Sequence, residues 1–146
     1  LSSYQFNGTL PVSMSRLSQV VHLDLSFNNF TGPLPSVNMS NNLKYLSLFH
    51  NALTRPIIST QWEKPLDLIS INLGDNSFSG KVPSTLFTLP SLQELILSRN
   101  GFDGVLDEFT HVSFSNLQFV DLSNNKLQGP IPQSFFHQKS LGYLLR

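Results

Sequence analysis

Apolar residues recur along the chain at fixed distances from an asparagine that returns every 23 to 25 residues. Apolar side chains stand eight, five and three places before this asparagine and two places after it. Four apolar columns over five rows form an internal repeat, which is sought before any single element is assigned. The five central asparagines are Asn28, Asn51, Asn76, Asn100 and Asn125.

The columns five and three places before the asparagine alternate with polar neighbours, which is the period-two pattern of a half-buried strand. One such strand per repeat, stacked on the next, gives a parallel sheet with strands about 4.8 Å apart. A period near 24 residues lies in the range of about 20–29 that is typical of leucine-rich repeats. We therefore expect a β-rich leucine-rich-repeat solenoid with its strands on the concave face, an irregular or short 3-10 convex side, and little α-helix. The expected strands are 22–26, 45–49, 70–74, 94–98 and 119–123, with a sixth opening at Leu141 and Leu144.

The repeated asparagine and glycine are interpreted as scaffold. An amide side chain both donates and accepts, so stacked asparagines can satisfy backbone groups that a turn leaves buried. The glycine four places later fits a turn position with positive φ. Arg55 replaces this glycine, and Ile58 and Asp107 replace prolines, so those coils are expected to bulge on the convex side. Trp62, between two repeats, is interpreted as a core residue.

The repeat divides the chain into a single array of about five full repeats with a partial repeat at each end. Solenoids need terminal repeats with a polar outer face, and neither end shows one, so we expect an internal piece of a longer array that is marginally stable alone. The expected units are 1–16, then 17–39, 40–64, 65–88, 89–113 and 114–137, then 138–146.

Composition excludes several classes of function. Lys plus Arg number 9 and Asp plus Glu number 9, so no basic field exists to attract nucleic acid. The absence of cysteine removes disulfide, thiolate and cysteine-zinc chemistry. Since no apolar run approaches the ~20 residues of a membrane span, no membrane contact is expected of this segment. No cofactor is expected.

The residues that could carry catalysis have simpler interpretations. His22, Asp24 and Ser26 share one strand face, where neighbours are about 6.6 Å apart, too far for a Ser–His hydrogen bond over two steps. The histidines lack metal-ligand spacing, and no glycine-rich phosphate loop is present. We expect neither an enzyme nor a metal site. A group of acidic residues is interpreted as solvated turn residues: Asp103, Asp107 and Glu108.

Binding is instead expected on the concave face. The columns six places and one place before the asparagine vary most between repeats and carry aromatic and charged residues, the types that dominate interface energies. Asp75 and Arg99 also fit a simple ion pair between adjacent rungs, which contributes little. The candidate ligand-binding residues are His22, Tyr45, Phe49, Asp75, Glu94, Arg99 and Phe119.

Three repeats end in a Gly-x-Leu/Val/Ile-Pro motif: GPLP at Gly32, GKVP at Gly80 and GPIP at Gly129. This ending is the mark of the plant-specific repeat class, and the whole chain resembles the ectodomains of plant receptor-like proteins and receptor kinases. The stretch from Trp62 to Leu145 resembles the Verticillium-wilt resistance receptor-like proteins in particular.

That resemblance implies a single-pass immune receptor whose ectodomain lies on the extracellular side of the plasma membrane. It implies a protein or peptide ligand of pathogen origin and signalling through a partner receptor kinase. Two alternatives stay open: the ectodomain of a receptor kinase for a peptide or steroid hormone, and a secreted protein of the polygalacturonase-inhibitor type. Three N-glycosylation sequons support the extracellular side, at Asn7, Asn29 and Asn38.

Overall fold

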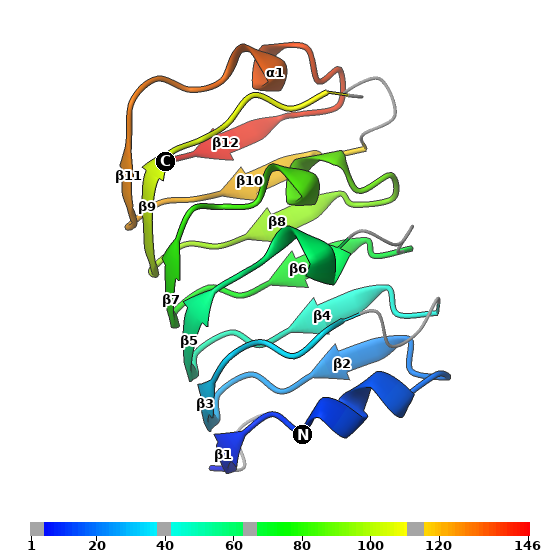
Figure 1. Cartoon of the computed structure of the whole chain (residues 1–146). Helices are drawn as coiled ribbons and strands as arrows, with labels where there is room; N and C mark the ends of the chain where they lie inside the picture. Colours follow the sequence, from blue (N-terminus) through cyan, green and yellow to red (C-terminus); the bar gives the residue numbers. More distant parts are fainter. Residues whose placement is uncertain (1–4, 38–41, 63–66, 111–115) are drawn as a thin grey trace.

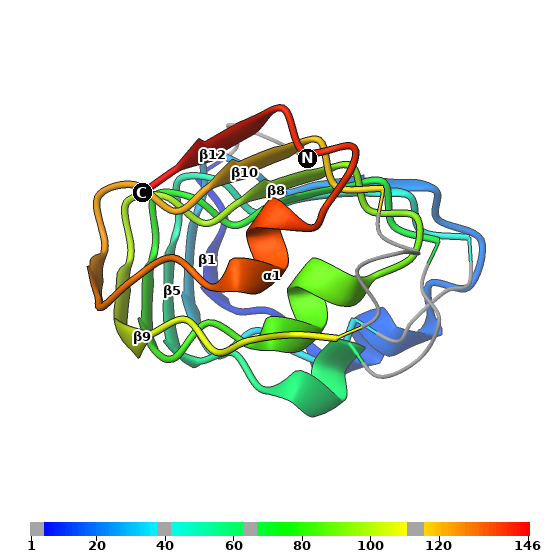
Figure 2. The same cartoon turned by 90° about the horizontal axis from the view of Figure 1, so that it is seen from above.

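The computed structural model describes residues 5–37, 42–62, 67–110 and 116–146. The chain winds through successive coils that stack on one another, and each coil contributes one strand to each of two parallel sheets (Figure 1). Viewed along the stack, the sheets form two sides of the solenoid and short helical segments lie opposite them (Figure 2). The predicted solenoid is therefore confirmed.

The first sheet contains the strands that the alternating pattern predicts, in the order β12-β10-β8-β6-β4-β2. Residues at equal distance from their central asparagine pair with one another, as Leu46 does with Ile71 and Ile71 with Leu95. Each strand has three residues instead of the expected five, because the chain then turns toward the second sheet. The strands are β2 (His22–Asp24), β4 (Tyr45–Ser47), β6 (Ser70–Asn72), β8 (Glu94–Ile96), β10 (Phe119–Asp121) and β12 (Tyr143–Leu145).

The second sheet is absent from the sequence-based expectation. Its strands pair with a stagger of two residues, so that Thr54 lies opposite Ser77 and Ser79 opposite Gly101. From β3 to β11, the large apolar residue that packs in or against the core is the one two places after the asparagine. One such residue per strand is too short a pattern for period-two alternation to be seen. The strands are β1 (Asn7–Thr9), β3 (Asn29–Gly32), β5 (Ala52–Pro56), β7 (Ser77–Gly80), β9 (Gly101–Val105) and β11 (Lys126–Gln128).

Short helical segments complete the coils. Within the described ranges three are 3-10 helices and one is a four-residue α-helix, in agreement with the expected short 3-10 segments and low α-helix content. They are η1 (Val12–Arg16), η2 (Ser59–Trp62), η3 (Ser84–Thr88) and α1 (Gln133–Phe136).

The core fills the space between the sheets and the helical segments. Phe78 and Phe102 are fully buried and stack with 6.2 Å between ring centroids, so the same column packs from coil to coil. Trp62 is 2% exposed and lies in this core, as expected. Each coil therefore buries its apolar residues largely against the neighbouring coils.

The repeated glycine occupies a left-handed backbone conformation, with φ between 73° and 78° at four coils. Arg55 adopts the same conformation, with φ of 74°. Its strand β5 nevertheless pairs with β3 on one side and β7 on the other. Arg55 therefore keeps the turn geometry of the glycines and pairs with Phe78 in β7. The bulges expected on the convex side of the coils with Arg55, Ile58 and Asp107 stay a prediction.

Candidate functional site

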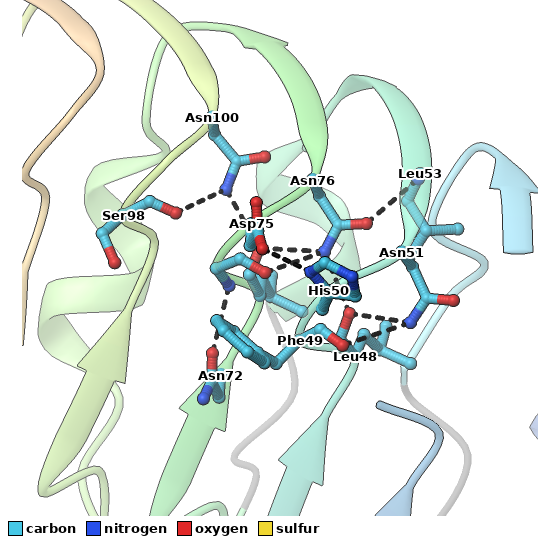
Figure 3. Close-up of polar contacts among 12 residues, drawn as sticks. Leu48, Phe49, His50, Asn51, Leu53, Asn72, Asp75, Asn76, Ser98 and Asn100 are labelled. Atoms are coloured by element: carbon cyan, nitrogen blue, oxygen red, sulfur yellow. Dashed lines mark hydrogen bonds and ion pairs between the residues drawn. The ribbon is translucent and has the colours of Figure 1, made fainter. Parts of the chain in front are cut away.

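The central asparagines tie each coil to the one before it. Asn76 Oδ1 accepts the Leu53 N–H at 3.0 Å, and Asn76 Nδ2 donates to the Leu48 carbonyl at 2.9 Å (Figure 3). The amide also donates to the carbonyls of Leu73 and Gly74 in its own coil. These bonds satisfy backbone groups at the turn, so the asparagines are structural. The Oδ1 contact recurs at Asn28, Asn51, Asn100 and Asn125.

The residues four places before the asparagine also hold the backbone. Asp24 Oδ1 accepts hydrogen bonds from the Ser26 hydroxyl at 2.5 Å and the Ser26 N–H at 2.9 Å. Asn72 Oδ1 accepts the Gly74 N–H at 3.1 Å in the same way. This column therefore fixes the end of each strand where an acceptor is present.

These hydrogen bonds shift the acidity of the two aspartates in the column. Hydrogen bonding from the Ser26 hydroxyl lowers the pKa of Asp24, although partial burial opposes the shift. At Asp121 partial burial raises the pKa, and hydrogen bonds from Ser123 and Ser98 outweigh it, so the pKa lies below its usual value. The charge of Arg99 lowers the pKa of Asp121 further. Both carboxylates are thus held ionised.

The His22, Asp24 and Ser26 side chains do not have the contacts of a nucleophilic triad. Ser26 donates to Asp24, and the His22 ring stacks on Tyr45 with 4.2 Å between ring centroids. A triad requires the histidine to accept the serine proton. In this arrangement the serine and the aspartate serve the backbone.

The residues six places before the asparagine form one continuous row across the outer face of the first sheet. Strand register places each member beside the next. Neighbouring members contact one another. Ser70 Oγ donates to Glu94 Oε2 at 2.7 Å, and the ring centroids of Phe119 and Tyr143 are 6.0 Å apart. This concave row consists of His22, Tyr45, Ser70, Glu94, Phe119 and Tyr143.

Two shallow depressions lie along the concave row. One, of about 260 Å³, is bordered by His22, Tyr45, Ser70 and Glu94 together with residues of the adjacent column. The other, of about 440 Å³, is bordered by Glu94, Phe119 and Tyr143. Glu94 therefore belongs to both depressions and lies at the boundary between them.

The residues one place before the asparagine were expected on the concave face, and the structure places them beyond the ends of its strands. All have φ near 55° and lie in the turn that leads from the first sheet to the second. Their N–H groups still bond to the next coil, as His50 does to the Gly74 carbonyl at 3.1 Å. The backbone must turn here to enter the second sheet. This corner row consists of Phe27, His50, Asp75, Arg99 and Asn124.

The expected ion pair between Asp75 and Arg99 does not form. Asp75 Oδ2 instead lies 2.5 Å from His50 Nδ1 of the preceding coil (Figure 3). Phe27 contacts both Phe49 and His50, at 5.3 Å and 5.2 Å between ring centroids. Members of the corner row therefore contact one another from coil to coil. Asp75 has a corner-row neighbour on each side, and the repeat alone does not indicate which of the two it binds.

The structure thus separates the sequence-predicted ligand residues into two groups. His22, Tyr45, Glu94 and Phe119 lie in the concave row. Asp75 and Arg99 lie in the corner row, and Phe49 lies beside it, beyond the end of β4. Sequence reasoning missed Tyr143, which is 68% exposed and continues the concave row. Its position directly before Leu144 carries the signal, because the repeat places a row residue there.

The acidic group of the fourth repeat is not simply solvated. Asp107 Oδ1 lies 3.4 Å from Lys81 Nζ. Glu108 accepts the N–H groups of Gln133 and Ser134 at 2.7 and 2.9 Å, and it also accepts the Ser134 hydroxyl. These bonds, the Ser134 hydroxyl first, lower the pKa of Glu108. Glu108 therefore holds the start of α1 from the preceding coil, which no local pattern indicates.

Two of the three sequons lie in described parts of the chain. Asn7 and Asn29 are both exposed, and they pair with each other across β1 and β3. Asn38 lies outside the described residues.

Over the ranges that the structure describes, no three His, Asp or Glu side chains lie close enough to hold a metal ion. Within the same ranges, no helix has the length and apolar character to cross a membrane.

The amino-acid sequence is similar to known leucine-rich-repeat proteins. The family model described as Leucine Rich Repeat matches residues 19–41, 67–89 and 116–138. Receptor-like protein 43 of Arabidopsis thaliana is 36% identical over 132 residues, which cover 89% of this chain and 18% of that protein. The chain therefore spans about a fifth of the length of this curated relative.

Solved structures with the same fold include several plant ectodomains. Pollen Receptor Kinase 3 superposes with a TM-score of 0.86 at 30% identity, covering 97% of this chain and 68% of that chain. The ectodomain of the Arabidopsis receptor kinase HAESA, solved in complex with an IDA peptide hormone ligand, superposes with a TM-score of 0.84 at 33% identity. The match covers 99% of this chain and 24% of that chain. A chain of the BIR3–SERK2 complex from Arabidopsis thaliana superposes with a TM-score of 0.75 at 31% identity, covering 90% of this chain and 69% of that chain.

Proposed function

The chain belongs to the leucine-rich-repeat family, and from that premise we propose that it is a ligand-recognition segment of a plant receptor ectodomain. The ligand is a peptide or protein that lies along the concave row. The whole chain acts as one array with the repeat boundaries given above. Among the family's members, the similarity to a receptor-like protein favours the receptor-like class.

The continuous concave row is the observation that carries this proposal. Its side chains lie on a rigid parallel sheet at strand spacing, so an extended ligand can contact several of them at once. The row includes the aromatic residues Tyr45, Phe119 and Tyr143, and Tyr45 and Tyr143 are exposed. Aromatic side chains are enriched among residues that dominate binding energy. A rigid surface also lowers the ordering cost of binding.

The role of the whole protein is a finer proposal. We propose an immune receptor on the extracellular side of the plasma membrane, of the Verticillium-wilt resistance type. It recognises a pathogen-derived molecule and signals through a partner receptor kinase. The BIR3–SERK2 complex among the similar structures supports such a partner.

A second candidate is the ectodomain of a receptor kinase for a peptide hormone. The similarity to the HAESA ectodomain, solved with a peptide hormone, favours it. Steroid recognition and a secreted inhibitor of the polygalacturonase type remain alternatives from the sequence. The full-length gene separates these candidates. A receptor-like protein has a short cytoplasmic tail, a receptor kinase has a kinase domain, and a secreted inhibitor has no membrane-spanning segment.

The test of ligand binding uses the full-length receptor. Tyr45→Ala, Glu94→Ala and Phe119→Ala, all in the concave row, are expected to reduce the response to the extract that activates the parent receptor. Lys126→Ala, on the exposed face of the second sheet, is the control. Surface expression of all variants must match that of the parent. If the three variants respond like the parent and Lys126→Ala abolishes the response, the concave-face proposal is wrong.

A further inference from the structure

We propose that the depression over β4, β6 and β8 is a subsite for one cationic side chain, Arg or Lys, of a peptide ligand. This inference rests on the proposed function and names the chemistry of the ligand. The subsite exists because the concave row is interrupted: Ser70, which is small, stands between Tyr45 and Glu94. The resulting notch has an aromatic wall on one side and a carboxylate wall on the other.

The aromatic wall is fixed in place. The His22 ring stacks on one face of Tyr45, with 4.2 Å between centroids and 12° between planes. The register places Ser70 on the other side of Tyr45, so the free face of the ring borders the notch. Tyr45 is 38% exposed, which leaves this face accessible. A cation within about 6 Å of such a ring centroid is attracted by its quadrupole.

The carboxylate wall is directed over the notch. The Ser70 hydroxyl donates to Glu94 Oε2 at 2.7 Å, which draws the Glu94 carboxylate toward the small residue. A carboxylate has about four acceptor sites on its two oxygens, so Glu94 keeps acceptor capacity for a ligand. A half-buried carboxylate that already has one fixed hydrogen bond loses less side-chain freedom on binding a cation.

The remaining lining suits the same occupant. Asp24 adds a second carboxylate, and among the described residues that line the depression none is Lys or Arg. Ser47 and Asn72 give a polar floor, and Ile96 gives an apolar flank for a methylene stem. The volume, about 260 Å³, is below the ~300–1,000 Å³ of small-molecule pockets. It therefore fits a single long side chain better than a whole small ligand.

An aromatic ring beside a carboxylate also suits a neutral sugar, and the two occupants differ in their need for charge. Glu94→Gln keeps the size of the side chain and an acceptor for the Ser70 hydroxyl but removes the negative charge. The substitution should weaken the binding of a cation, whereas it should affect much less the binding of a sugar that uses Glu94 only as an acceptor. The charge dependence therefore decides between them.

The experiment titrates this chain with three probes and follows its amide signals by nuclear magnetic resonance. The probes are acetyl-Gly-Gly-Arg-Gly-Gly-amide, the same peptide with citrulline in place of Arg, and a trimer of N-acetylglucosamine. We expect the Arg peptide to shift the amide signals of Tyr45, Ser70 and Glu94, and citrulline to bind about tenfold more weakly. A tenfold change is about 1.4 kcal/mol, close to the lower end of the range for a hydrogen bond to a charged group.

Matched variants complete the test. Glu94→Gln is expected to weaken the Arg peptide about tenfold and leave the citrulline peptide unchanged. Asp107→Asn removes the same charge at a site away from the depression and should leave both affinities unchanged. Tyr45→Leu should weaken the Arg peptide severalfold, while Tyr45→Phe retains its affinity. Undisturbed dispersion of the amide spectrum shows that each variant is folded.

Three results would overturn the subsite: equal affinity for the Arg and citrulline peptides, no effect of Glu94→Gln on the Arg peptide, or shifts at the notch with the oligosaccharide alone. The response of the full-length receptor separates the two proposals. If Tyr45→Ala and Glu94→Ala abolish that response while the charge preference is absent, ligand binding on the concave row stands and the cationic subsite fails.

Discussion

Asn76 and Leu53 belong to successive coils, and the Asn76 Oδ1 accepts the Leu53 N–H at 3.0 Å (Figure 3). The same side chain donates to the Leu48 carbonyl of the preceding coil at 2.9 Å. One amide therefore bonds both a donor and an acceptor of a neighbouring coil. The stacking of coils depends on this dual hydrogen-bonding capacity.

Asn76→Ala is expected to lower the free energy of unfolding by about 1–3 kcal/mol, because it leaves the Leu53 N–H without its acceptor. The Leu48, Leu73 and Gly74 carbonyls each keep another donor. Asn76→Asp should cost a similar amount, since a carboxylate cannot donate to the carbonyls. Urea-induced unfolding measures both. Asn124→Gly, an exposed position whose φ of 55° glycine tolerates, is the control and should change stability by less than about 1 kcal/mol. Equal losses in Asn76→Ala and the control would contradict the prediction.

Gly74 stands where three other repeats have serine, and the structure explains the exception. A Cβ on Gly74 would lie 3.2 Å from Ile96 Cγ2 and 3.3 Å from Phe49 Cδ2. Gly74→Ser is therefore expected to destabilise the protein by about 1 kcal/mol through overpacking. Phe49→Ala should remove only part of that penalty, because Ile96 Cγ2 and Asn72 Oδ1 stay equally near. A double-mutant cycle measures the coupling, and strictly additive effects would show that Phe49 does not cause the requirement for glycine.

Arg55→Gly is expected to stabilise the protein. Arg55 has a φ of 74°, where the equivalent residues of the other full repeats are glycines. The left-handed conformation costs a non-glycine residue about 1–2 kcal/mol, whereas glycine costs about 0.5–1 kcal/mol in chain entropy. The net gain should be roughly 0.5–1 kcal/mol, seen as a rise in melting temperature. Arg55→Ala keeps the strain and should show no such rise; a gain as large as that of Arg55→Gly would point to charge instead.

Glu108 should make the stability depend on acid pH. Its pKa is lowered from 4.5 in the folded protein, first by the Ser134 hydroxyl and then by the Ser134 and Gln133 N–H groups. The ionised form therefore stabilises the fold above about pH 4.5, and this contribution is lost as the pH falls through the lower folded pKa. Glu108→Gln is expected to flatten the pH dependence of the melting temperature in this window, and Ser134→Ala to flatten it in part. If the melting temperature of both variants falls with acid pH as it does in the parent protein, Glu108 does not have this role.

Asn7 and Asn29 are expected to carry N-linked glycans when the protein is secreted from plant cells. Both are exposed in adjacent strands of the second sheet and begin Asn-x-Thr sequons. Peptide mass analysis before and after enzymatic removal of glycans measures the occupancy. Thr9→Ala and Thr31→Ala should each remove one glycan. Unmodified peptides at both positions in secreted protein would refute the assignment.

The sequence alone determined the parts of this protein that depend on fixed offsets within a coil. The apolar pairs such as Leu46 and Leu48 predict the first sheet, because alternate residues of a strand face one side. The recurring distance between asparagine and glycine predicts a left-handed turn, because glycine enters it at low steric cost. Repetition strengthens such signals, since every coil gives an independent copy. The concave row followed from the same offsets, and Tyr143 could have been assigned from them.

Only the tertiary structure decided how one coil meets the next away from the first sheet. The two-residue stagger of the second sheet, as between Thr54 and Ser77, has no counterpart in the period of the sequence. Asp75 binds His50 of the preceding coil and not Arg99 of the following one, although both stand at the same place in the repeat. Glu108 binds Ser134, 26 residues away, because coil stacking places α1 beside it. Such contacts depend on side-chain direction across coils, which periodicity does not encode.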